Sequence, residues 1–287
     1  MEPFERGRLL LKLMLVLARD RRAMQGRIQT TGFVREYGEL PPDLGVMTLG
    51  RLGDDEIAAL AESVGIRPAP AGAKCDIFMN GYGYRIESLA AYPPVIIDDV
   101  EPDGLAAACR LAGIPADRFG ERLEACRQAA ERRSTRAPVR TETGAIPGAI
   151  GPAPSEPANA PAGPAHAPSG PAAGREDDRP VPEADGGPRP ALESDEIRIA
   201  DPESPLKDDR EWLAPLIEYF WFTGSERGRS HFPADYLLDF DDPLNMNTWR
   251  TFDKRYAVEA VWDRLAIRIA RVGRDGAPRE AVRIRVV

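Results

Sequence analysis

The sequence predicts a mixed α/β protein with two folded portions, about residues 1–133 and 206–287, joined by a long disordered linker. Three observations predict this organisation. Both portions contain segments whose apolar residues recur at helical spacing, and both contain short alternating segments bounded by turn residues. Residues 134–205 are rich in Pro, Ala and Gly instead. The chain has 287 residues, so its folded part is long enough for one medium domain or two small ones.

The first portion begins with a helix predicted over residues 4–24. Its apolar run is interrupted by Lys12 and lacks a small-residue cleavage site, so we interpret it as a buried helix rather than a signal peptide. The run is also too short to span a bilayer. Three acidic residues at 54–56 indicate the start of a second helix, which ends at Gly65.

Strands and helices alternate in the rest of the first portion. Residues 74–79 and 84–89 are predicted strands joined through Asn80-Gly81, which is a strong hairpin signal. The apolar run 95–97 is a further candidate strand, and helices are predicted over 103–112 and 117–133.

Residues 134–205 form the predicted linker. Almost no large apolar side chain occurs in its central part. Such a segment cannot bury enough apolar surface to offset the entropy lost on ordering. We therefore expect a flexible tether.

The second portion opens with an aromatic-rich helix predicted over 209–222. A strand over 236–240 and a helix over 253–264 follow. Residues 265–272 and 279–287 alternate with period two around a turn, which predicts a closing hairpin.

Charge and cysteine content limit the classes of function only weakly. The formal charge is −8, but most of it falls in the linker, so it excludes neither nucleic acid nor other partners. Cys75, Cys109 and Cys126 have no CxxC spacing, which is typical of a reducing compartment and leads us to expect a cytoplasmic protein. With only two histidines, a Cys/His zinc site would need an unusual ligand set.

The predicted hairpin carries the residues that could support chemistry. With a two-residue turn at Asn80-Gly81, Asp76 faces Arg85; with a four-residue loop it faces Glu87. Both registers place the same polar set on one face, namely Lys74, Asp76, Arg85 and Glu87. The other face is apolar and carries Ile77, Met79, Tyr84 and Ile86. Either the polar face is a solvent-exposed network of salt bridges, or it is a functional site.

Two carboxylates beside cations could hold Mg²⁺ for phosphodiester hydrolysis. Carboxylate oxygens suit this hard ion, which activates a water and stabilises charge on a phosphate. Asp76 and Glu87 are the candidate metal ligands, and Lys74 or Arg85 would assist the water or the phosphate. Asp98 and Asp99 are further candidates, although acids at a strand end more often form turns.

At this point the sequence resembles the PD-(D/E)XK, or restriction-endonuclease-like, family. The resemblance lies in the runs 73–81, 83–88 and 93–94, and in the stretch from 222–224 to 233–235. It implies a mixed central sheet flanked by helices, Mg²⁺ as cofactor, double-stranded DNA as substrate, a homodimer, and Asp76 as a metal ligand.

The second half of the motif departs from the family pattern. Taken as the acid-x-Lys triplet, residues 85–87 have Arg in place of the acid and Glu in place of Lys, whereas residues 87–89 keep the acid and lose the Lys. Some family members use Glu at the Lys position, and Lys74 lies on the correct face to substitute. Glu56 and Glu62 are candidates for a third acid.

Two groups of residues are candidate DNA contacts. Arg227, Arg229 and His231 lie in a Gly-containing loop, which could reach phosphates or could simply be solvated. Arg268, Arg283 and Arg285 could form a basic stripe, or the polar outer face of the closing hairpin. The aromatic side chains of the second portion are expected in the core rather than on a base-stacking platform; they are Trp212, Tyr219, Phe220 and Trp221.

The function expected from these features is Mg²⁺-dependent cleavage of double-stranded DNA, as in a restriction or defence enzyme. The alternative is a catalytically inactive nuclease fold that binds DNA or belongs to a defence complex. A third interpretation is an interaction protein whose two modules bind other proteins across the tether.

Overall fold

The computed structural model describes residues 1–32, 38–136, 196–274 and 277–287. These residues belong to one compact unit that both portions build together. Most of the predicted linker lies outside the described residues. Its boundaries shift, because α5 continues to Arg136 and the chain is already folded from Glu196, where β5 pairs with β10. The side chains of Ile197 and Ile199 are buried in the larger apolar core, so residues 196–205 belong to the fold.

About half of the secondary-structure elements described in the first portion are helices. They are α1 (Pro3–Asp20), α2 (Val46–Arg51), α3 (Asp54–Ser63), α4 (Pro102–Ala112) and α5 (Asp117–Arg136). The helix predicted over 4–24 therefore ends earlier, at Asp20. Among the described residues, no helix combines the length and the apolar character that crossing a bilayer requires.

The second portion contains two α-helices and three short helical turns of other types. They are α6 (Arg210–Glu218), the π-helix η1 (Tyr219–Thr223), η2 (Met246–Thr248), α7 (Lys254–Val261) and η3 (Trp262–Arg264). The single helix predicted over 209–222 is thus α6 continued by η1. The helix predicted over 253–264 is α7 with η3.

A mixed five-stranded sheet lies at the centre of the fold, in the order β1-β2-β3-β8-β9. Its strands are β1 (Ile28–Thr30), β2 (Ile77–Met79), β3 (Tyr82–Glu87), β8 (Tyr236–Phe240) and β9 (Trp249–Asp253). All neighbours are antiparallel except β3 and β8, which run parallel. The central strand pair therefore joins the two portions of the chain.

A second sheet, entirely antiparallel, has the order β4-β11-β10-β5. Its strands are β4 (Val95–Val100), β5 (Glu196–Arg198), β10 (Leu265–Arg274) and β11 (Ala277–Val286). A single central sheet was expected, whereas the described residues form two large sheets and a two-stranded one, β6 (Gly224–Ser225) with β7 (Gly228–Arg229). Pro93 and Pro94 explain the difference, because they interrupt strand pairing after β3 and let β4 pair with the closing hairpin.

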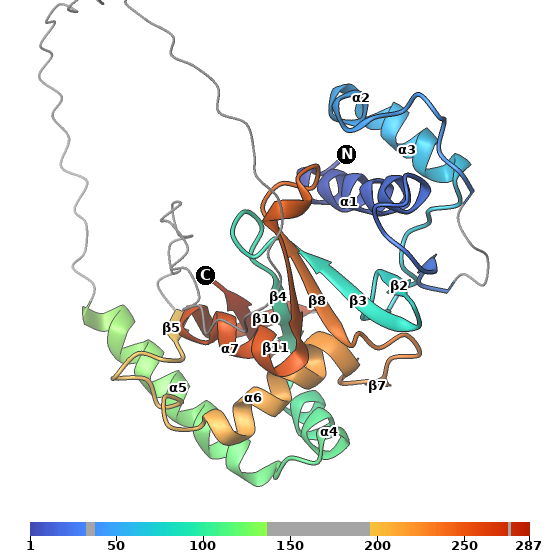
Figure 1. Ribbon diagram of the computed structural model, residues 1–287. Coiled ribbons are helices and arrows are strands. Elements are labelled where there is room, and N and C mark those ends of the chain that lie inside the picture. The colour runs from blue at the N-terminus through green and yellow to red at the C-terminus, as the bar shows by residue number, and fades with distance from the viewer. Residues whose placement is uncertain (33–37, 137–195, 275–276) are drawn as a thin grey trace, which may run out of the picture. The chain divides into compact units, whose positions relative to one another are not determined.

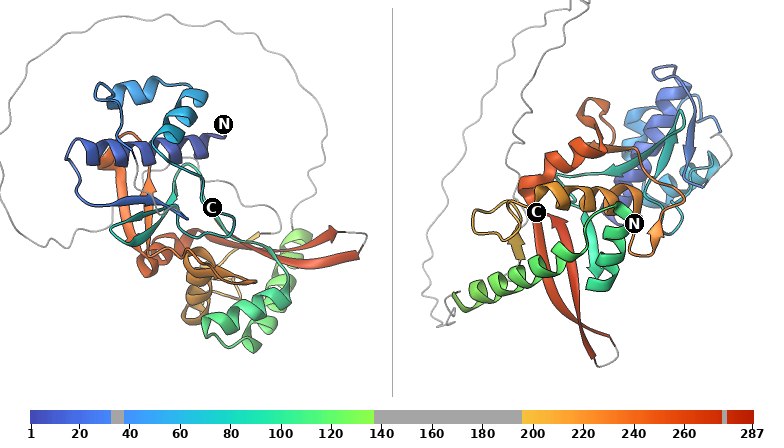
Figure 2. Two further views of the ribbon diagram at one scale, coloured as in Figure 1. Left: turned by 90° about the vertical axis from the view of Figure 1, so that its right-hand side faces the viewer. Right: turned by 90° about the horizontal axis from the view of Figure 1, so that it is seen from below.

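Helices cover both faces of the first sheet. Figure 1 shows α1, α2 and α3 on one side of β3 and β8. On the other side α7 contacts β8 and β9, whereas α4 and α5 contact strands of the second sheet. Two apolar cores result, one between α1, α3 and the first sheet, the other among α4 to α7 and both sheets. Figure 2 shows α5 crossing the β10–β11 hairpin, in agreement with its contacts to β5 and β10.

Candidate carboxylate row and cationic pocket

The hairpin turn has the two-residue form. Asn80 and Gly81 both have positive φ, 54° and 88°, as the tight turn of an antiparallel hairpin requires. Met79 pairs with Tyr82, and the backbone N–H of Asp76 donates to the carbonyl of Tyr84 at 2.8 Å. The register in which Asp76 lies opposite Arg85 is therefore correct, and the four-residue loop is wrong.

Both faces of the hairpin are buried. The apolar set Ile77, Met79, Tyr84 and Ile86 packs in the core beneath α1 and α3, as the alternation predicted. Asp76 and Glu87 on the polar face are only 3% and 4% exposed. The interpretation of this face as a solvent-exposed salt-bridge network is therefore wrong, because these carboxylates are buried, Asp76 pairs with Arg8 of α1, and Arg85 reaches the carbonyl of Trp221 in η1.

Asp76 uses both carboxylate oxygens inside the protein. Oδ2 accepts a hydrogen bond from the backbone N–H of Ile86 at 2.8 Å, at the point just before β2 begins at Ile77. Oδ1 forms an ion pair with Nη2 of Arg8, which comes from α1. The carboxylate thus closes the open end of the β2–β3 ladder.

Glu87 and Asp239 lie side by side, because β3 and β8 are parallel and these residues are register partners. Arg85 Nε donates to Glu87 Oε1 at 2.5 Å, and Arg85 Nη1 donates to the carbonyl of Trp221 in η1 at 3.0 Å. Asp239 is 1% exposed; Oδ1 accepts from the N–H of Leu89, and Oδ2 pairs with Arg250 of β9 at 2.8 Å. Burial raises the pKa of Asp239, while Leu89 and Arg250 oppose the rise.

Asp76, Glu87 and Asp239 therefore form a row of buried carboxylates on β2, β3 and β8, which we call the carboxylate row. Each member has an arginine partner, respectively Arg8, Arg85 and Arg250. Sequence reasoning missed Asp239 and Arg8. An acid at an inward position of the apolar strand 236–240 was the signal that could have identified Asp239.

The predicted third acids lie elsewhere. Glu56 caps α3 by accepting from the N–H of Gly53, and Glu62 pairs with Arg67 at 3.5 Å. Asp98 and Asp99 lie on β4 in the second sheet, where both pair with Arg283 at 2.9 Å. Within the described ranges, no three His, Cys, Asp or Glu side chains are grouped so that they could hold a metal ion.

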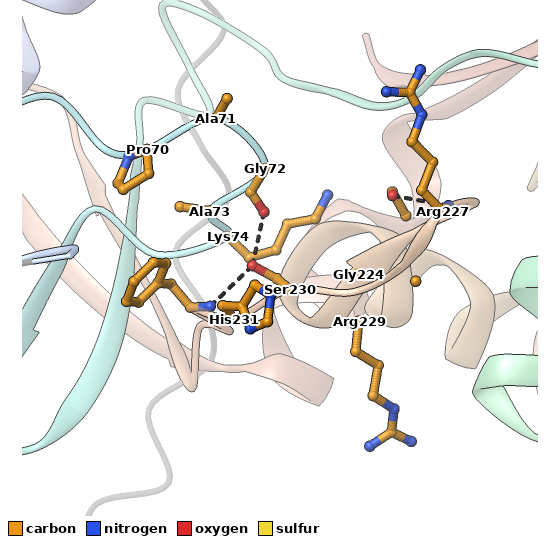
Figure 3. Close-up of a pocket in the computed structure, with 13 residues that line it drawn as sticks. Pro70, Ala71, Gly72, Ala73, Lys74, Gly224, Arg227, Arg229, Ser230 and His231 are labelled. Carbon is orange, nitrogen blue, oxygen red and sulfur yellow. Dashed lines mark hydrogen bonds between the residues drawn. The ribbon is translucent and has the colours of Figure 1, made fainter.

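A pocket of about 540 Å³ opens next to the hairpin (Figure 3). Two segments line it: residues 70–74, which lead into β2, and residues 224–225 with 227–232, which contain the short strands β6 (Gly224–Ser225) and β7 (Gly228–Arg229). The hydroxyl of Ser230 donates to the carbonyl of Gly72 at 2.8 Å and links the two segments. The backbone N–H of Lys74 donates to the carbonyl of Phe232 at 2.9 Å.

The side chains that line this pocket include Lys74, Arg227, Arg229 and His231 and no acid, so we call it the cationic pocket. Figure 3 shows Arg227 and Arg229 pointing to opposite sides of their loop. Arg227 is highly exposed and pairs with Glu226 at 3.2 Å. Burial, reinforced by Arg85 and opposed by Glu226, lowers the pKa of Lys74 to about 8. Lys74 therefore lines the pocket and also interacts electrostatically with Arg85, which is the ion-pair partner of Glu87 in the carboxylate row.

Two of the three arginines predicted to form a basic stripe on the closing hairpin, Arg283 and Arg285, are paired with acids. Arg285 makes a bidentate ion pair with buried Glu196, at 2.6 and 2.7 Å, and Arg283 pairs with the two acids of β4. Arg268 lies opposite Glu196 in the β10–β5 ladder. These contacts stabilise the second sheet, so the cationic pocket is the stronger candidate for phosphate contacts.

The aromatic side chains of α6 and η1 are buried, as expected for core residues. Trp212, Tyr219, Phe220 and Trp221 all belong to the larger apolar core. The three cysteines are buried free thiols, and burial raises their pKa, to about 12 for Cys126. Neither group is available for base stacking or for nucleophilic chemistry.

Comparison of the chain with protein-family models, with curated proteins and with solved structures gives no match. The geometry of the site therefore carries the functional argument alone.

Proposed function

We propose that this protein acts on double-stranded DNA as a restriction-endonuclease-like protein. The supporting observation is that the cationic pocket and the carboxylate row share one hairpin. Lys74 lines the pocket and Asp76 belongs to the row, and only Cys75 separates them in the chain. A phosphate held in the pocket would therefore contact the segment that leads into the carboxylate row, although the carboxylates themselves are buried and do not line the pocket. Asp76 opens one strand and Glu87 lies on the next, which is the placement that the family resemblance implies.

The fit of Mg²⁺ to this site is incomplete. Carboxylates are the oxygen ligands that Mg²⁺ prefers, and Asp76, Glu87 and Asp239 would supply them. In the described arrangement, however, arginines and backbone N–H groups occupy these oxygens. The residues as arranged therefore do not provide a site for the ion, and binding would require an arginine to leave.

Two candidate activities follow. Metal-dependent cleavage is favoured by three buried carboxylates on neighbouring strands, because burying charge is costly and such groups concentrate at functional sites. Binding without cleavage is favoured by the one-to-one pairing of these carboxylates with arginines. DNA binding is common to both, and cleavage of both strands would further require a homodimer with two active sites.

The deciding experiment is incubation of the purified protein with a sequence-diverse DNA pool and Mg²⁺ or Mn²⁺, with DNA binding followed in parallel. Discrete fragments that disappear in Asp76→Ala and in Glu87→Ala would establish the nuclease. Salt-sensitive binding without cutting would establish the inactive binder. A protein that neither binds nor cuts DNA would refute the proposal and direct attention to protein partners.

The pocket itself is tested by Arg229→Ala, with Arg255→Ala as the control. Arg229 is exposed and lines the pocket, whereas Arg255 is an exposed arginine of α7 that pairs with Glu259. Loss of one phosphate contact should reduce the slope of log K against log salt by roughly 0.9. The slope of Arg255→Ala should stay at the wild-type value. Equal slopes for wild type and Arg229→Ala would exclude this pocket as the phosphate site.

A further inference from the structure

Arg8 is held at Asp76 by a set of contacts from its own helix. Its Nη1 donates to Glu5 at 2.7 Å, one turn earlier in α1, while Nη2 pairs with Asp76. The guanidinium also lies over the ring of Phe4, with 5.4 Å between its central carbon and the ring centroid. Its orientation is therefore fixed from two sides.

The rest of the guanidinium is poorly satisfied. Arg8 Nε is buried and has no hydrogen-bond partner in the described part of the protein, which lowers stability. The ion pair with Asp76 compensates, because an isolated buried carboxylate would cost far more. The role of Arg8 is therefore charge compensation at Asp76.

A second cation of α1 lies nearby. Lys12 follows Arg8 by one helical turn and is only 4% exposed, and it interacts electrostatically with Arg8 and Cys75. The described residues provide no hydrogen bond or ion pair for its ammonium group. Asp76 is thus paired with Arg8, and a second buried cation, Lys12, lies one helical turn further along α1. Electrostatic repulsion from these cations opposes the approach of any further positive ion.

We propose that Arg8, supported by Lys12, occupies the place of a metal ion at Asp76 and closes the carboxylate row to divalent cations. The inference rests on the proposed function and deepens it, because it concerns the same carboxylates. It explains how these groups remain buried in the folded protein without a bound metal ion. Removing the two cationic groups would leave Asp76 uncompensated, and a divalent cation would then be the replacement that its oxygens favour.

The test measures Mn²⁺ binding without DNA, so its result is independent of whether the protein binds or cuts DNA. Thermal unfolding and Mn²⁺ electron paramagnetic resonance are compared for the wild type and for Arg8→Gln/Lys12→Met. We expect no Mn²⁺ effect on the wild type. In the double variant, Mn²⁺ at about 100 times its Kd should raise Tm by roughly 5 °C or more.

Adding Asp76→Asn to the double variant serves as the matched control, and it should abolish the Mn²⁺ effect. Mn²⁺ binding to the wild type that depends on Asp76 would overturn the proposal, because Arg8 would then not exclude the ion. Absence of Mn²⁺ binding in the folded double variant would overturn it as well. If the double variant is unfolded by itself, Mn²⁺ should restore its fold, and failure to do so counts against the proposal.

Discussion

At the scale of the residue, the fold depends on how buried charges are compensated. Asp76 is an example. One carboxylate oxygen accepts the hydrogen bond of the Ile86 N–H, and the other forms an ion pair with Arg8 of α1. The alternation of the sequence predicted the face on which Asp76 and Glu87 lie. It did not predict that both would be buried, because burial depends on which helices cover that face.

Lys12 provides a residue-scale prediction about pH. Burial, reinforced by Arg8 and opposed by Glu5 and Cys75, lowers its pKa from 10.5 to about 8. Between these values the unfolded chain binds more protons than the folded protein, so the free energy of unfolding rises with pH in this window. At pH 7 the cost of keeping Lys12 charged is about 3 kcal/mol.

Lys12→Met should therefore raise the free energy of unfolding at pH 7, by up to about that amount. The advantage over the wild type should shrink as the pH rises from about 8 to 10.5. Urea unfolding at several pH values checks this, and exposed Lys207→Met should change stability by no more than about 0.5 kcal/mol. A difference between the Lys12 variant and the wild type that does not depend on pH would contradict the assigned ionisation.

At the scale of the element, the β2–β3 hairpin is positioned by a close contact with the chain that precedes β8. The N–H of Gly83 donates to Asp235 Oδ2 at 2.9 Å, and the N–H of Asp235 donates to the carbonyl of Gly83 at 2.7 Å. A Cβ at Gly83 would lie 2.5 Å from the carbonyl oxygen of Pro233. The absence of a side chain at Gly83 is what allows β3 and this segment to approach.

Gly83→Ala is therefore expected to destabilise the protein by about 1–3 kcal/mol, because backbone must move to admit the methyl group. Gly120→Ala is the matched control, since Gly120 lies in α5 with open space around its Cβ position. Alanine there should be neutral or stabilise by up to about 1 kcal/mol. Denaturant midpoints of the two variants check the prediction, and equal midpoints would show that the close approach is not required.

At the scale of the whole molecule, both large sheets combine strands from the two portions. β3 of the first portion pairs with β8 of the second, and β4 pairs with β11. Glu196 and Arg285 add a buried ion pair that ties β5 to the closing hairpin. Neither portion therefore completes either of the two large sheets by itself.

Residues 1–137 and 188–287, produced as separate chains, should each fail to fold. Their sheet edges and apolar faces would be exposed to water, which favours aggregation. Co-expressed, the two chains should copurify as one complex with the circular dichroism spectrum of the intact protein. Independent, cooperative thermal unfolding of the first chain alone would show that it is a domain in its own right.

The sequence by itself determined the helices other than α2, the β2–β3 hairpin with its apolar face, and the core role of the aromatic residues. These features depend on local periodicity and turn chemistry, which act over a few residues. Only the tertiary structure decided that the strands form two large sheets, that Asp239 joins Asp76 and Glu87, that Arg8 pairs with Asp76, and that Arg283 and Arg285 are neutralised. The physical reason is that these contacts join residues far apart in the chain, so they depend on how the helices and strands pack and not on any local pattern.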